Sequence, residues 1–203
     1  MVRKPYIGGI ELKRGEIESL DVYPFSLPVL RSLERLELHP AVTFFVGENG
    51  LGKSTLLEAL AVGCGFNAEG GTKNFNFGTR ESHSQLHRFL QIARGHPRPQ
   101  TGYFFRAESF FNVATEIEKL GVGSSYGERS LHEQSHGESF LALVMNRFSG
   151  NGLYLLDEPE AALSPQRQLA VMTRMHHLVQ QKSQFIIATH SPLLMAYPEA
   201  WIY

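Results

Sequence analysis

One nine-residue stretch, Gly47–Thr55 (GENGLGKST), restricts the fold of this chain more than any other feature. It follows an apolar, β-rich run over residues 42–46 and leads directly into the helical pattern LLEALAV. Glycines at these spacings let the backbone curl so that its N–H groups converge, and the start of the following helix adds partial positive charge there. The stretch therefore predicts a phosphate-binding loop between a strand and a helix.

The loop further predicts a nucleotide site in which each residue type has its own task. Lys53 is expected to reach the β- and γ-phosphates and to assist catalysis, and the Ser54 hydroxyl to bind Mg²⁺. The nucleotide-binding residues predicted from this stretch are Gly47, Glu48, Asn49, Gly50, Leu51, Gly52, Lys53, Ser54 and Thr55.

Three further apolar runs, at residues 103–105, 153–156 and 185–188, resemble the run before the loop. Short continuous runs of this kind are typical of strands buried on both faces of a mostly parallel sheet. Ser164 and Pro165 suit the N-cap and first position of a helix. Helical spacing recurs in three sets: Phe110, Val113, Ala114 and Ile117; Phe140, Leu141, Val144, Met145 and Phe148; and Leu169, Met172, His176 and Val179.

This alternation of strands and helices predicts an α/β fold in which helices flank a mostly parallel sheet. Residues 1–203 are expected to form a single domain with a helical insertion over about residues 80–150. The segment Glu199–Tyr203 predicts the start of a further strand.

Composition narrows the classes of function. A formal charge of −1, from 19 basic and 20 acidic residues, gives no overall attraction to nucleic acid or anionic lipid. Cys64 is the only cysteine, which excludes an intrachain disulfide and a four-cysteine zinc site and suits a reducing cytosol. The stretch MVRKPYIGGIELKRG lacks the apolar core expected of a secretory signal, and no apolar run approaches the ~20 residues needed to cross a bilayer. We expect a cytoplasmic protein without membrane insertion.

Two acids directly follow the apolar run at residues 153–156, in the sequence LYLLDEP. Adjacent carboxylates at the end of a strand point in different directions, so one can face a metal while the other faces water. Asp157 is expected to bind Mg²⁺, and Glu158 to orient or deprotonate the attacking water. The next apolar run ends in THSP, where His190 is expected to reach a γ-phosphate from the same edge of the sheet.

In their order, these motifs resemble those of the ATP-binding-cassette (ABC) class of ATPases, and within it the soluble branch related to chromosome-maintenance and recombination ATPases. The match runs from about residue 22 to residue 203. It comprises a Walker A motif (GENGLGKST), a signature-like stretch (SHGES), a Walker B motif with an adjacent glutamate (LYLLDEP), a D-loop-like stretch (ALSP) and a switch histidine (THSP).

The resemblance implies a P-loop NTPase fold with a small helical signature subdomain, and an ATP hydrolase that uses ATP and Mg²⁺. It also implies a head-to-tail homodimer that forms on ATP binding. In that dimer Ser135, Gly137 and Glu138 of one copy would face the γ-phosphate bound by the other, with Ser135 capping the helix that begins near Gly137.

Two motifs depart from the pattern of the family. The signature is commonly LSGGQ, whereas Gln134–Glu138 has a histidine for the first glycine and a glutamate for the glutamine. No glutamine follows the apolar run at 103–105, where the family has its Q-loop, so Glu108 is the candidate metal ligand there. Tyr23 is a candidate for stacking on adenine, with a place in the core as the alternative.

The residues around the signature also allow a second interpretation, because His132–His136 (HEQSH) fits the zinc-protease pattern H-E-x-x-H. Zinc binding would require both histidines on one face of a continuous helix, and Gly127, Ser130 and Gly137 leave little room for such a helix. We therefore favour the nucleotide interpretation.

The segment Arg80–Arg98 raises the question of a nucleic-acid surface. His83 and His87 predict the polar face of a helix whose other face is Leu86, Phe89 and Leu90. A solvated helical face is favoured over a nucleic-acid patch, so a nucleic-acid partner has no support beyond the family resemblance.

Two other functions stay open from the sequence. One is a nucleotide-gated binding module with little turnover, which acts as a switch for a protein partner. The other is the motor subunit of a membrane transporter, against which the glutamate at position 138 and the missing Q-loop glutamine count.

Overall fold

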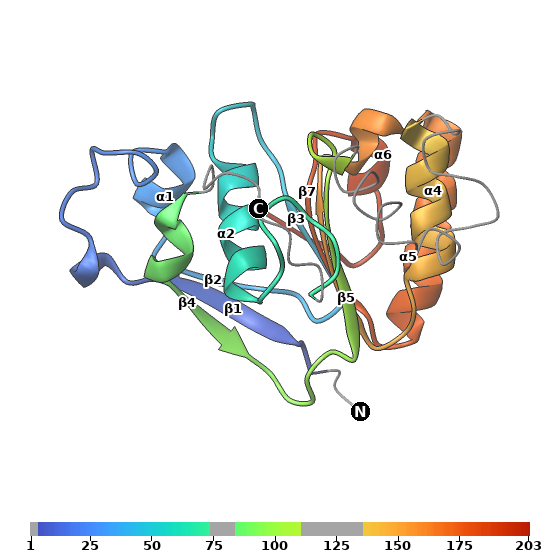
Figure 1. The fold of residues 1–203 in the computed structure, drawn as a ribbon, viewed down its shortest axis with the longest axis horizontal. Helices are drawn as coiled ribbons and strands as arrows, with labels where there is room; N and C mark the ends of the chain where they lie inside the picture. The colour runs from blue at the N-terminus through green and yellow to red at the C-terminus, as the bar shows by residue number, and fades with distance from the viewer. Residues whose placement is uncertain (1–3, 74–83, 111–135) are drawn as a thin grey trace.

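The structure is a computed structural model that describes residues 4–73, 84–110 and 136–203, and its main element is a five-stranded sheet (Figure 1). The strands follow the order β5-β6-β7-β3-β8, and every neighbouring pair is parallel. Their bounds are β3 Val42–Phe45, β5 Thr101–Arg106, β6 Gly152–Asp157, β7 Gln184–Ala188 and β8 Trp201–Ile202. The predicted α/β fold with a mostly parallel sheet is therefore confirmed, and so is the strand predicted near the last residues.

Helices cover both faces of this sheet because alternate strand residues point into two separate cores. Phe44, Tyr154 and Ile187 belong to the core beneath α4, α5 and α6, whereas Phe45 and Ile186 belong to the core that contains α2. The bounds of these helices are α2 Lys53–Gly63, α4 His136–Arg147, α5 Pro165–Gln180 and α6 Pro192–Met195. Two-sided burial explains why the strands read as continuous apolar runs.

A second, three-stranded sheet is antiparallel and was not predicted from the sequence. Its order is β2-β1-β4, and it packs on the side of α2 that faces away from the parallel sheet (Figure 1). Gln184 joins the two sheets, because its side chain accepts from the backbone N–H groups of Tyr6 and Ile7 and donates to the carbonyls of Ile7 and His39. The strand bounds are β1 Ile7–Leu12, β2 Arg35–Glu37 and β4 Leu90–Arg94.

Short elements complete the description: α1 Pro28–Ser32 and the 3-10 helices η1 Arg14–Glu16, η2 Gln85–Phe89 and η5 Pro159–Ala162. Within the described ranges, no helix combines the length and apolar content of a bilayer-spanning segment.

The prediction of a helix around His87 is wrong. Residues 85–89 form the 3-10 helix η2 and residues 90–94 form strand β4. Leu86 and Leu90 are both buried, a spacing that a turn followed by a strand satisfies as well as a helix does. Since β5 is also a strand, residues 84–106 of the helical insertion expected over residues 80–150 contain no α-helix. The α-helix described within that range is α4. His83 lies outside the described residues.

The helix predicted after Pro165 is present, but its buried face is not the predicted one. The Ser164 hydroxyl accepts a hydrogen bond from the Arg167 N–H, which confirms the predicted N-cap. Leu169, placed on the apolar face by the sequence pattern, is 51% exposed. The buried positions are instead Gln168, Val171, Met175 and Leu178, one residue earlier along the helix.

Candidate nucleotide-binding site

The candidate site residues lie at or just after the ends of four strands, at one edge of the parallel sheet. Arg106 ends β5 in register with Asp157 at the end of β6, and Asp157 is in register with Ala188 at the end of β7. His190 follows Ala188 after one residue, and the phosphate-binding loop follows β3. Residues from distant parts of the sequence therefore meet where parallel strands end, as binding-site residues do in α/β folds.

The loop between β3 and α2 has the backbone conformation that its glycines were expected to allow. Gly47, Gly50 and Gly52 have φ angles of 140°, 82° and 100°, which are unfavourable for any residue with a Cβ. Gly52 is the N-cap of α2, and a Cβ there would lie 2.8 Å from Val29 Cγ1 in α1. The glycines thus serve both the curled backbone and the close approach of α1.

Lys53 lies inside this loop rather than in solvent. Its side chain is buried, and its Nζ donates to the carbonyls of Gly47 and Glu48 at 2.8 and 2.9 Å. The ammonium group is therefore held among the backbone groups that would surround a phosphate chain. This position is the one expected for a lysine that binds the β- and γ-phosphates.

Asp157 is almost fully buried, and one of its carboxylate oxygens has no hydrogen-bond partner among the described residues. Asp157 forms a hydrogen bond with Ser54, and the oxygen in question is Oδ1. Burial raises its pKa from 3.8 to about 6, against the opposing effects of the Ser54 hydrogen bond and the Arg106 charge. A buried carboxylate oxygen without a partner, next to a hydroxyl, fits the oxygen ligands that Mg²⁺ prefers.

These two residues would supply only part of the coordination shell of Mg²⁺. In the described ranges, no group of three or more His, Cys, Asp and Glu side chains is arranged to hold a metal ion. Mg²⁺ is often held by one or two carboxylates together with substrate phosphates, so the site fits a metal that arrives with a nucleotide. When bound, the ion would neutralise phosphate charge.

Glu158 and His190 lie side by side, with Glu158 Oε1 3.4 Å from His190 Nε2. Both side chains are about one-third exposed (37%), so water can reach them. Glu158 has a φ angle of 48°, a left-handed conformation that is rare for a glutamate. The backbone N–H of His190 donates to Glu160, which fixes the turn after β7.

Two of the clefts beside the loop share Ser54, Thr55 and Glu108. The first, of about 290 Å³, runs from the loop glycines to Glu158. The second, of about 380 Å³, is polar and extends to Tyr23. Tyr23 is 64% exposed, so it is available for stacking and is not a core residue. Glu108 lines both clefts, and its side chain is 85% exposed. Its role as a metal ligand stays a prediction.

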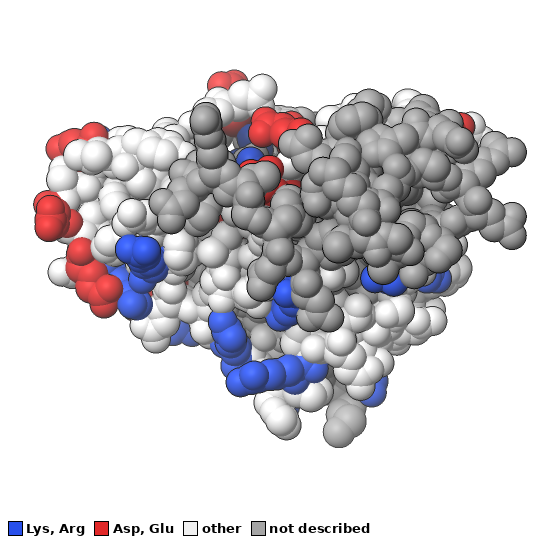
Figure 2. All heavy atoms as spheres, in the orientation of Figure 1, with Lys and Arg blue, Asp and Glu red and all other residues white. Residues whose placement is uncertain are grey.

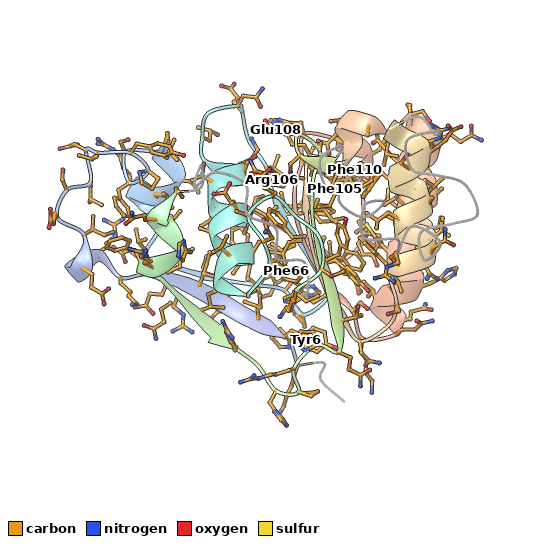
Figure 3. All side chains as sticks on the ribbon, in the orientation of Figure 1. Tyr6, Phe66, Phe105, Arg106, Glu108 and Phe110 are labelled. Carbon is orange, nitrogen blue, oxygen red and sulfur yellow. The ribbon has the colours of Figure 1, made fainter. Side chains whose placement is uncertain are left out.

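Arg106 is the residue of this site that the sequence analysis missed. Its guanidinium contacts Glu58 at 2.6 Å, Glu108 at 3.6 Å and Asp157 at 3.8 Å. In Figure 3 Arg106 and Glu108 lie close together near the top of the sheet, and Figure 2 shows basic and acidic side chains next to each other in the hollow there. The signal was available, because Arg106 ends one apolar run as Asp157 ends another.

The described signature-like residues Gly137 and Glu138 lie on the other face of the sheet, at the start of α4. Gly137 is buried in the first turn of α4, and a Cβ on it would overlap the carbonyl oxygen of Ala162 in η5. Glu138 forms an ion pair of 3.0 Å with Arg167 in α5. Ser135 lies outside the described residues, as do residues 132–134 of the zinc-protease pattern, so the structure tests neither interpretation of that stretch.

Three features define a P-loop nucleotide-binding domain. They are a curled loop between a strand and a helix, a buried lysine within that loop, and a carboxylate at the end of a nearby parallel strand. A family model described as "AAA domain" matches residues 25–148, more than half of the chain. The chain therefore belongs to this AAA-domain family, which confirms the sequence-based recognition of a P-loop ATPase. The ABC class within it stays a prediction. A second model, described as "AAA domain, putative AbiEii toxin, Type IV TA system", matches residues 116–196.

Comparison with solved structures also found matches, at low sequence identity, whereas no curated protein matches the chain. One is described as "Putative ABC transporter (ATP-binding protein)" from Pyrococcus furiosus, with 16% identity, a TM-score of 0.45 and coverage of 84% of this chain and 88% of its own. Another is an SMC head domain from Thermotoga maritima, with 16% identity, a TM-score of 0.38 and coverage of 81% and 86%.

Proposed function

We propose that this chain is an Mg²⁺-dependent ATP hydrolase whose copies close head to tail around ATP. The observation that carries the proposal is the meeting of Lys53, Asp157, Glu158 and His190 at one edge of the sheet. Lys53 would bind the β- and γ-phosphates, and Asp157 with Ser54 would hold the metal. We further propose that residues 1–203 act as one ATPase domain in the cytoplasm.

Hydrolysis requires a group that prepares water for attack on the γ-phosphate. Glu158 borders the cleft that also contains Lys53 and the loop glycines, and it is open to solvent. Its carboxylate is therefore suited to orient or deprotonate the attacking water. His190, 3.4 Å from Glu158, would donate to the γ-phosphate or keep the Glu158 carboxylate in position.

The division of the sheet into two faces supports the head-to-tail arrangement. α2, which begins at the phosphate-binding loop, packs on one face, whereas Gly137 and Glu138 begin a helix on the other face. Gly137 is also packed against η5 of its own chain. A second copy is thus the natural source of a signature-like helix end opposite the nucleotide. If the γ-phosphate contacts both chains, its loss removes a shared ligand and weakens the dimer.

The test is the substitution Glu158→Gln, which removes the proposed base and keeps the shape of the side chain. We expect ATP hydrolysis to fall by on the order of 100-fold or more, and the variant to accumulate as an ATP-bound dimer in light scattering. Lys53→Ala serves as the control, because it should bind no nucleotide and stay monomeric. A Glu158→Gln variant that turns over ATP at the wild-type rate, or a wild-type monomer with full turnover at every concentration, would contradict the proposal.

The same experiment addresses the alternative of a nucleotide-gated binding module. Such a module would bind ATP and dimerise with turnover no higher than that of Lys53→Ala. The solvent-accessible Glu158 carboxylate at the cleft, with His190 3.4 Å from it, favours the hydrolase.

A further inference from the structure

Arg106 contacts carboxylates of three residues around the predicted metal site, Glu58, Glu108 and Asp157. Its Nη1 atom lies 2.6 Å from Glu58 in α2 and also donates to the Ala68 carbonyl at 3.3 Å. Its Nη2 atom lies 3.6 Å from Glu108, and its Nε atom lies 3.8 Å from Asp157 Oδ2. One arginine thus reaches from the helix after the phosphate-binding loop to the metal-binding strand.

These contacts differ in strength. Arg106 and Glu58 are both largely buried, with side-chain exposures of 17% and 11%, and their short ion pair anchors the guanidinium. Glu108 is exposed, so its contact at 3.6 Å is weak. The Nε atom is buried beside Asp157 and has no hydrogen-bond partner in the described part of the chain. Glu58 therefore holds Arg106, and Arg106 in turn faces Asp157.

We propose that Arg106 is a positioning residue, which fixes the Asp157 carboxylate for Mg²⁺ while Glu58 holds the guanidinium in place. The inference rests on the proposed ATP-hydrolysing site. Arg106 faces Oδ2 of Asp157, whereas Oδ1 is the buried oxygen without a hydrogen-bond partner among the described residues. A cation can therefore bind Oδ1 without breaking the contact with Arg106.

The Glu58 pair also explains why an arginine is compatible with a metal site. An isolated guanidinium beside Asp157 would repel a divalent cation. The carboxylate of Glu58, only 2.6 Å away, balances that charge. Partners that orient a metal ligand in this manner typically change metal affinity by about 10–100-fold when they are removed.

The experiment measures how much Mg²⁺ strengthens nucleotide binding, by titrating a fluorescent ATP analogue in EDTA and in Mg²⁺. In Arg106→Met this gain, the ratio of the affinity in Mg²⁺ to the affinity in EDTA, should fall by about tenfold. Arg106→Lys should recover part of the gain, because it keeps the charge but not the planar geometry. Arg174→Met is the matched control, since Arg174 is also partly buried but lies in the helix layer on the other face of the sheet.

The double variant Arg106→Met with Glu58→Met separates positioning from stability. It removes both charges of the buried pair, and such replacements are often neutral or stabilising, so it should melt near the wild-type temperature. If Arg106 positions Asp157, Mg²⁺ should strengthen nucleotide binding by the double variant as little as it does for Arg106→Met. A double variant with the full wild-type gain would overturn the inference, because Arg106 would then only neutralise Glu58. A wild type without any Mg²⁺ gain, or one that binds ATP no better than Lys53→Ala, would instead overturn the proposed function.

Discussion

The first turns of α2 and α4 both depend on a glycine, for different physical reasons. Gly52 before α2 has a φ of 100° and helps the loop backbone to curl, so its main task is conformational. Gly137 in α4 is not among the described glycines with positive φ, and it is required because Ala162 lies against it. The glycine at the α2 end thus serves the curl of the loop backbone, and the glycine at the α4 end serves close packing against η5.

Charge distinguishes the two ends in the same way. Near α2, Asp157 is buried with an oxygen that lacks a hydrogen-bond partner among the described residues, and it has a raised pKa. Near α4, Glu138 is half exposed and paired with Arg167. When Asp157 is ionised, its burial lowers stability at the α2 end, whereas the half-exposed pair of Glu138 and Arg167 carries no such cost. Sites that bind cations or anions commonly show this trade of stability for function.

The largest expected effect comes from Gly52→Ala. The substitution places a Cβ at a left-handed φ and against Val29, so the loop backbone must move. The loss of two or more charge-assisted hydrogen bonds to phosphate should weaken ATP binding by on the order of 100-fold or more. Isothermal titration with ATP and Mg²⁺ measures this. Gly15→Ala is the matched control, because a Cβ at Gly15 meets nothing within 4 Å.

A smaller effect of a different kind is expected from Gly137→Ala. The added Cβ overlaps the Ala162 carbonyl, and such overpacking costs about 1–3 kcal/mol, or several degrees in melting temperature. ATP affinity of the monomer should stay within about twofold of wild type. In the Glu158→Gln background, the ATP-bound dimer should be lost. A tenfold weaker affinity of the monomer for ATP would break the proposed distinction between the two helix ends.

The last expected effect concerns the stability of the protein without nucleotide. The pKa of Asp157 is 3.8 when unfolded and about 6 when folded, so stability falls as pH rises from about 4 through 6. Asp157→Asn removes that loss and should raise the free energy of unfolding at pH 7.5 by up to about 2–3 kcal/mol, with no gain below pH 4.

Denaturant unfolding at several pH values measures the difference. Glu138→Gln is the control from the α4 end, where an exposed ion pair should contribute less than about 1 kcal/mol. With ATP and Mg²⁺ the order of stability should reverse, because Asp157→Asn binds the metal poorly. A destabilised Asp157→Asn at pH 7.5 without nucleotide would show that the carboxylate contributes to the fold.

The parts of the site that are continuous in sequence were the parts that could be predicted. The stretch Gly47–Thr55 carries its own turn chemistry, and the acids after residues 153–156 follow directly from the end of a buried strand. Both depend on short-range geometry. The antiparallel sheet was missed because its strands lie far apart in the sequence and show no clear alternation: β1 and β4 are paired although about 80 residues separate them.

The sequence alone determined the parallel α/β core, the phosphate-binding loop and the carboxylates at the end of β6, because local backbone preferences and apolar patterns specify them. Only the tertiary structure decided that Arg106 reaches Asp157 and Glu58, that Gly137 packs on Ala162 and that Gln168, not Leu169, faces the core. These depend on which elements lie side by side. Packing between distant segments decides which face of a helix is buried and which residues meet at the ends of neighbouring strands. The apolar pattern of a single segment carries no information about that packing.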